Sequence, residues 1–193
     1  MLKRISKFVI VLMVMPMLSS CSYNTMISLD EQVKEAWANV EAAYQRRTDL
    51  IGNLVETVKG SGKFEKEVLT DVINARSKAS SMQVNANDLT PENIAKFQEA
   101  QSQLGGALSR LLVTVEKYPD LKTTAQYAEL MNELNRTENR INVARVDFNN
   151  AVKSYNTTIR SFPNNLVAMI FGFKAKDMFK AEAGAEKAPK VSF

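Results

Sequence analysis

The stretch that decides the fold is residues 127–162, YAELMNELNRTENRINVARVDFNNAVKSYNTTIRSF, which contains no glycine or proline. Large apolar or aromatic side chains occupy every seventh position, and mostly small residues fill the slots between them. This spacing places both series on one stripe of an α-helix, which has to be buried against other helices. The large positions are Tyr127, Leu134, Ile141, Phe148, Tyr155 and Phe162, and the intervening ones are Leu130, Thr137, Ala144, Ala151 and Thr158.

Three other segments carry a similar stripe. The first begins at the capping-box sequence Ser28-Leu29-Asp30-Glu31, and the third opens with Thr90 as N-cap and Pro91 as first helical residue. No window alternates polar and apolar residues with period two, so no strands are expected. The sequence predicts an all-α protein, an elongated antiparallel bundle of four main helices with a short C-terminal helix. The expected helices are at about 29–59, 63–82, 91–118 and 121–162.

The first 21 residues form a separate segment. Three basic residues precede an apolar run from Phe8 to Leu18, and two serines then lead to Cys21, the only cysteine. This pattern predicts a bacterial secretory signal at 1–20 whose cleavage site is also a lipidation site, with Cys21 acylated. As a helix the apolar run rises only about 16 Å, well short of a bilayer core of about 30 Å. An uncleaved anchor over Ile5 to Ile27 and a plain signal peptide are the alternatives.

The mature chain is then expected to consist of a lipid-anchored linker at 21–28, a helical bundle domain at 29–180 and a disordered tail at 181–193. Membrane lipid would be its first partner, through the acylated Cys21. Ser22 favours the outer membrane, so we expect an exported lipoprotein on the periplasmic side of a Gram-negative envelope, or otherwise on the outer face of the membrane. Removal of residues 1–20 takes away three basic residues and leaves a formal charge near neutrality, which gives no reason to expect nucleic acid as a partner.

The composition argues against catalysis. The chain contains no histidine, so the commonest general base and metal ligand is missing. The single thiol is assigned to lipid, and neither Gly60-Ser61-Gly62 nor Gly105-Gly106 has the neighbours of a phosphate-binding loop. We therefore expect no enzyme activity, no cofactor, no metal site and no small-molecule substrate.

Arg47 occupies a position in the first helix where the stripe should be apolar. One interpretation is that Arg46 or Arg47 lays its stem along the bundle edge and keeps its charge in water. The other is a desolvated Arg47 paired with a carboxylate of a facing helix, for which Glu116 and Glu138 are the candidates.

Two further features leave alternatives open. Asparagine is a poor helix former, so Asn53, Asn139, Asn149 and Asn156 either bind a neighbouring helix end or side chain, or form one continuous polar strip for a partner. The segment from Leu166 to Phe173 is apolar all round and too short to span a bilayer. It is expected either to fold back onto the bundle end or to lie on the membrane with the following lysines towards lipid headgroups.

Several blocks, in order along the chain, resemble the LemA family over about residues 23–180. They include Glu35 to Val40, Arg46 to Val55, Glu116 to Lys122 and Thr137 to Ile141, followed by Arg145, Asn149, Tyr155-Asn156 and Phe162-Pro163. The resemblance implies a long helical bundle facing the periplasm or cell exterior, and no established activity. Two departures are Gly52, where the family usually has proline, and the lipidation sequence, where many members have a longer apolar helix.

The function expected from the residues and the resemblance together is a non-catalytic, lipid-anchored helical scaffold or interaction protein of the bacterial cell envelope. Its partner would be another envelope protein or a second copy of the chain. The alternative is an accessory regulatory subunit of a membrane protease or phosphatase-like envelope protein, because relatives are often encoded near such proteins. The residues expected to be structural or partner-facing are Trp37, Arg46, Arg47, Asp49, Asn53, Glu116, Glu138, Asn139, Arg140, Arg145, Asn149 and Asn156.

Overall fold

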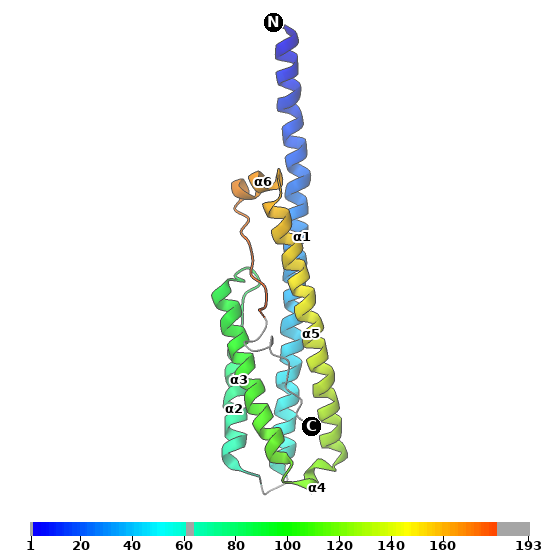
Figure 1. Cartoon of the computed structure of the whole chain (residues 1–193), viewed down its shortest axis with the longest axis vertical. Coiled ribbons are helices and arrows are strands. Elements are labelled where there is room, and N and C mark those ends of the chain that lie inside the picture. The colour runs from blue at the N-terminus through cyan, green and yellow to red at the C-terminus, as the bar shows by residue number, and fades with distance from the viewer. Residues whose placement is uncertain (1, 61–63, 181–193) are drawn as a thin grey trace, which may run out of the picture.

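The computed structural model describes residues 2–60 and 64–180, with side chains described for 22–60 and 64–180. Within these ranges the chain forms helices and no strand, as Figure 1 shows. The predicted all-α bundle is therefore confirmed. The helices are α1 (Leu2–Gly60), α2 (Lys66–Ser81), α3 (Pro91–Val115), α4 (Pro119–Lys122), α5 (Ala125–Arg160) and α6 (Asn164–Phe171).

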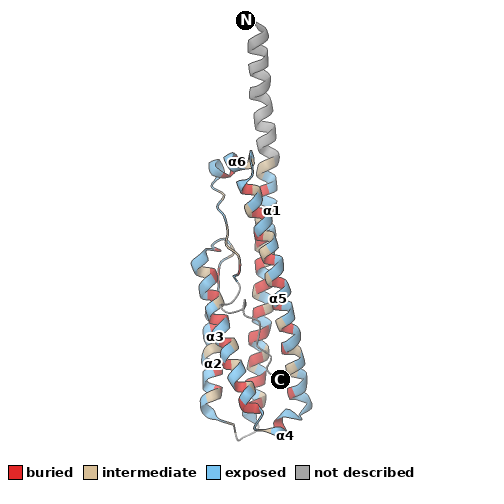
Figure 2. Cartoon of the chain, in the orientation of Figure 1, coloured by how far each residue is buried: buried red, intermediate tan, exposed pale blue. Residues whose placement is uncertain are grey.

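The framework of the molecule is the antiparallel pair α1 and α5, which make the most extensive contact between any two helices (Figure 1). The 36 residues of α5 extend about 54 Å. Buried residues form a stripe along the facing sides of the two helices, as the repeat of seven predicts (Figure 2). Of the six large positions named for the last helix, five are buried, but Phe162 is 81% exposed because α5 ends at Arg160.

The shorter helices α2 and α3 form a hairpin that covers only the part of the α1–α5 pair remote from α6 (Figure 1). The apolar seam near α6 therefore needs another cover. It is supplied by the α2–α3 loop, which buries Val84 and Leu89, and by the non-helical residues 172–180, which bury Phe179. We call residues 172–180 the C-terminal strap.

The predicted start of the first helix was wrong. Ser28 does not cap a helix there, because α1 runs through this sequence without interruption from Leu2. The last long helix also begins later than expected. Pro119 starts the separate one-turn helix α4, and the Thr124 side chain then caps α5 by accepting a hydrogen bond from the Tyr127 N–H at 3.3 Å.

The remaining boundaries differ from prediction by a few residues. The short C-terminal helix is present as α6, and Gly172, with a φ of 75°, ends it in the left-handed conformation that glycine adopts without strain. Among the residues with described side chains, no helix is long and apolar enough to cross a membrane. The Cys21 side chain and the tail at 181–193, which we expected to be disordered, lie outside the described residues.

Candidate functional site

The site with the most hydrogen bonds between distant parts of the chain is the contact in which two asparagines of α5 hold the C-terminal strap. The Asn156 side-chain amide donates to the Lys176 carbonyl at 2.7 Å and accepts from the Lys176 N–H at 2.9 Å. Asn149 repeats the arrangement with Phe179, donating at 3.2 Å and accepting at 2.9 Å. Each amide thus satisfies both backbone groups of one strap residue, as a neighbouring β-strand would.

The spacing of the two asparagines explains why a helix can bind an extended chain in this way. Seven residues of helix rise about 10.5 Å. Three residues of extended chain, the step from Lys176 to Phe179, span about 10 Å. Because the two lengths agree, the strap runs antiparallel to α5, with its backbone groups at the height of Asn156 and then Asn149.

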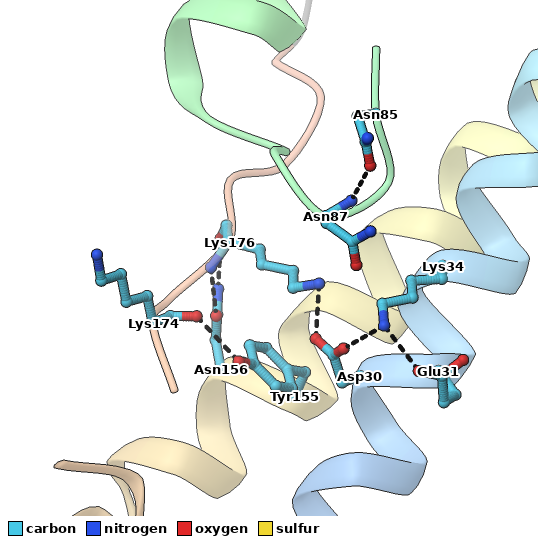
Figure 3. Close-up of polar contacts among 9 residues, drawn as sticks. All are labelled: Asp30, Glu31, Lys34, Asn85, Asn87, Tyr155, Asn156, Lys174 and Lys176. Carbon is cyan, nitrogen blue, oxygen red and sulfur yellow. Dashed lines mark hydrogen bonds and ion pairs between the residues drawn. The ribbon is translucent and has the colours of Figure 1, made fainter. Parts of the chain in front are cut away.

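Charged and phenolic groups fix the strap at the end close to α6 (Figure 3). The Lys176 ammonium lies 2.7 Å from an Asp30 oxygen, and the side chains are only 13% and 19% exposed. The other Asp30 oxygen lies 3.0 Å from the Lys34 ammonium. The Tyr155 hydroxyl donates to the Lys174 carbonyl at 3.0 Å, and burial together with the nearby Asp30 charge raises the pKa of Tyr155 to about 12. A neutral phenol is therefore available as donor at any pH near neutrality.

An aromatic cluster holds the other end of the strap. The Phe179 ring stacks on Trp37 at a centroid distance of 5.8 Å and meets Phe148 edge-on at 5.4 Å. The Arg145 guanidinium lies 5.1 Å from the centre of the Phe179 ring and donates to the Lys180 carbonyl at 3.2 Å. Gln98 of α3 donates to the same carbonyl at 3.1 Å, which ties the strap to a third helix.

We expect stability to depend on the Asp30 contacts in acid. Burial alone would raise the pKa of this carboxyl, but hydrogen bonds from Lys176 and Lys34 outweigh burial and hold the pKa below its ordinary value. A carboxyl whose pKa is lowered by folding stabilises the native state above its unfolded pKa, and this contribution is lost as the pH falls through the lowered value. Asp30→Asn should cost about 1 kcal/mol at neutral pH, because the pair keeps some access to water.

The measurement is thermal unfolding followed by circular dichroism from pH 7 to pH 3. Below about pH 5, the Asp30→Asn protein should lose less stability with falling pH than the wild type does. The matched control is Glu31→Gln, which changes a 64% exposed carboxylate bound to Lys34 and leaves the contact between Asp30 and Lys176 in place. Parallel pH profiles for the wild type and Asp30→Asn would contradict this assignment.

Arg47 forms a second polar cluster in the middle of the bundle. Its guanidinium donates to the Gln101 carbonyl of α3 at 2.8 Å and lies 3.3 Å from a Glu138 oxygen of α5. The Arg47 side chain is only 8% exposed, so of the two interpretations the second is confirmed: Arg47 is largely removed from water and pairs with Glu138. Glu116 was the wrong candidate, because it lies near α4, where it pairs with Lys122 at 2.6 Å. Arg46 is half-exposed and pairs with Glu133 at 2.7 Å.

The other predicted site residues lie in different environments, so the predicted set does not form a single site. Trp37 is fully buried and its indole N–H donates to the Val84 carbonyl at 3.1 Å. Asp49 is exposed and accepts from Gln45 at 3.0 Å. Asn53 is exposed and lines a shallow groove near the α4 end of the bundle. Asn139 and Arg140 line another groove, of about 600 Å³ between α1 and α5, together with Arg46 and Val143.

The sequence reasoning missed the strap itself. It placed neither Asp30 nor Lys176 nor Phe179 at a site, and the two explanations offered for the asparagines did not include binding to an extended chain. The available signal was the spacing of Asn149 and Asn156, seven residues apart beside the stripe of α5. In the part of the chain that the structure describes, no group of three or more His, Cys, Asp or Glu side chains could hold a metal ion.

The fold and these contacts define a class of protein. It is an elongated α-helical bundle in which the extended C-terminal strap completes the core near the end of the α2–α3 hairpin. The LemA family profile matches residues 36–193, and the chain belongs to the LemA family. The resemblance carried by the sequence blocks is confirmed.

Curated relatives align with most of this chain. Magnetosome protein MamQ 2 of Paramagnetospirillum magneticum is 28% identical over 185 residues, covering 85% of this chain and 66% of the relative. Magnetosome protein MamQ of Magnetospirillum gryphiswaldense is 27% identical, covering 81% and 64%. Protein LemA of Metamycoplasma hominis is 26% identical over 145 residues, covering 75% and 63%. The chain thus spans slightly less than two thirds of the length of these relatives.

Proposed function

We propose that the protein is a lipid-anchored, non-catalytic helical scaffold of the bacterial cell envelope, tethered through an acylated Cys21 on the outer side of a membrane. The observation that carries the proposal is the junction between tether and bundle. Tyr23, two residues after Cys21, packs on Phe171 at 4.8 Å and on Phe173 at 5.8 Å between ring centroids. A lipid on Cys21 would therefore attach to the packed end of the bundle, and the helices would extend away from the bilayer.

The groove between α1 and α5 supports a docking role for the bundle. It lies on the two longest helices and is lined by Asn39, Asn139, Arg140 and the 61% exposed Val143. Side chains that can donate, accept and make apolar contact are the usual components of a protein interface. We propose an envelope protein or a second copy of the chain as the partner on this face.

Metabolic labelling with a palmitate analogue tests the anchor. The wild-type chain should carry the label and should lose residues 1–20, whereas Cys21→Ser should carry no label. An unlabelled wild-type chain, or equal labelling of the two proteins, would refute lipid anchoring.

Photo-crosslinking in cells tests the docking face. A photoreactive amino acid in place of Val143 should give a discrete adduct, and one in place of Val113 of α3, which is 70% exposed, should not. An adduct of twice the chain mass would identify self-association, and a larger one would identify an envelope partner by mass spectrometry. Adducts from both positions or from neither would refute this face. An adduct with a membrane protease or phosphatase whose activity changes when the chain is deleted would favour the accessory-subunit alternative.

A further inference from the structure

The end of the bundle next to α6 exposes a concentrated apolar surface. Half of the exposed large apolar side chains in the described part of the chain lie within ten consecutive residues. Val167 and Ala168 on the other side of α6 are buried, so the helix is packed against the bundle along one side only. The exposed members, which we call the α6 patch, are Phe162 (81%), Leu166 (46%), Met169 (75%), Ile170 (74%) and Phe171 (58%).

The contacts of α6 keep this patch exposed. The Phe173 N–H donates to the Ala168 carbonyl at 2.9 Å, which closes the end of α6. The strap that follows is bound to Tyr155 and Asn156 on α5. Because both the end of α6 and the start of the strap are fixed, the helix cannot turn its apolar face towards the bundle without breaking these bonds. Exposed apolar patches of this kind mark interaction surfaces.

We infer that the α6 patch is a second membrane contact, which lies in the lipid headgroup layer beside the N-terminal anchor. The inference rests on the proposed function in taking the bilayer to lie at the Cys21 end of the bundle. Phe171 is itself a member of the patch and touches Tyr23. Tyr23 follows the apolar run that ends at Leu18 by only five residues. Along a helix this is about 7.5 Å, so any bilayer reached by that run or by acyl chains on Cys21 is adjacent to α6.

The charges at this end of the bundle favour a lipid surface over an acidic or strongly hydrated partner. From Phe148 to Lys176 the chain contains no Asp or Glu, whereas Lys153, Arg160 and Lys174 are exposed. On α1, residues 22–29 carry no charge, and the first carboxylate, Asp30, is engaged by lysines. Apolar side chains flanked by basic ones are typical of helices that lie in the interface of membranes with anionic lipids. Two contacts, the tether and the α6 patch, would fix the bundle in one orientation relative to the bilayer.

The test uses the protein in its acylated form, with residues 1–20 removed, reconstituted into vesicles of phosphatidylethanolamine and phosphatidylglycerol. A solvatochromic fluorescent amino acid replaces Met169 in one protein and Val146, 58% exposed on α5, in the matched control. Both sites are exposed, so neither replacement disturbs the core. Co-flotation with the vesicles reports the tether, and quenching by lipids with a nitroxide at known depths reports the position of the probe.

The inference predicts that the probe at 169 shifts to the blue on vesicles and is quenched from a depth of about 5–10 Å below the headgroup level, while the probe at 146 stays in water. If the chain floats with the vesicles and both probes stay in water, the tether stands and the inference fails. A probe at 169 that is already shielded without vesicles would indicate a second copy on the patch and would also overturn it. A chain that does not float refutes both the tether and the second contact.

Discussion

Replacing Phe179 by alanine should lower the free energy of unfolding by about 3–5 kcal/mol, the usual cost of truncating a buried aromatic side chain. Phe179 is 6% exposed and contacts Trp37, Phe148 and Arg145. Its loss removes these contacts and opens the seam beside Trp37, where the strap meets the first turns of α3. The effect is large because Phe179 is the one side chain of the strap that is buried.

The chain supplies its own reporter for this prediction. Trp37 is the only tryptophan, and Phe179 stacks on it with an angle of 17° between the rings. In Phe179→Ala, urea denaturation should give a lower midpoint, and the native emission of Trp37 should move to longer wavelength as water reaches the indole. Lys174→Ala is the control, because this exposed residue contributes its backbone carbonyl to the Tyr155 bond. Unchanged emission and an unchanged midpoint would show that the strap does not complete the core in solution.

The helices could be predicted because their burial is encoded locally. A residue such as Ile141 or Leu134 faces the core for the same reason in any bundle, namely its place in a repeat of seven. The end of α1 at Gly60 and the interruption between the last two long helices at Pro119 are likewise encoded by single residues. The start of α1 was predicted wrongly because the capping-box sequence at Ser28 was assumed to begin a helix, whereas α1 continues through it. The Asp30 carboxylate binds Lys176, which is 146 positions away in the chain, and no local pattern reveals such a contact.

The strap was unpredictable for a related reason. Asn149 and Asn156 bind its backbone, so most strap positions are free of sequence constraints and show no periodicity. Its side-chain contacts come from Lys176 and Phe179 and, near α6, from Phe173, and these residues form no periodic pattern. The sequence did show that helix propensity cannot explain these asparagines, because asparagine is a poor helix former. Each therefore needs a hydrogen-bond partner. The identity of that partner emerged only from the arrangement of the helices.

Arg47 departs from the apolar repeat, and its buried charge is only partly satisfied by the bundle. Its Nη atoms reach Gln101 and Glu138, but its Nε is buried without a hydrogen-bond partner in the described part of the chain. The desolvation of the charge is therefore only partly compensated. Because Arg47 joins α1 to both α3 and α5, its contribution is tied to the register of three helices.

We expect Arg47→Ala to lower the free energy of unfolding by about 3 kcal/mol, because truncation removes both the packing of the long side chain and its bonds to two helices. Arg47→Met should cost clearly less, since methionine fills much of the same volume and brings no charge to desolvate. Glu138→Gln should cost least, because this side chain is 45% exposed and water can replace the ion pair. Thermal and urea unfolding of the three variants would establish the order. If Arg47→Met were as unstable as Arg47→Ala, the ionic and hydrogen-bonding contacts, rather than packing, would dominate at this position. An Arg47→Ala protein that melts like the wild type would show that the Arg47 cluster does not stabilise the bundle.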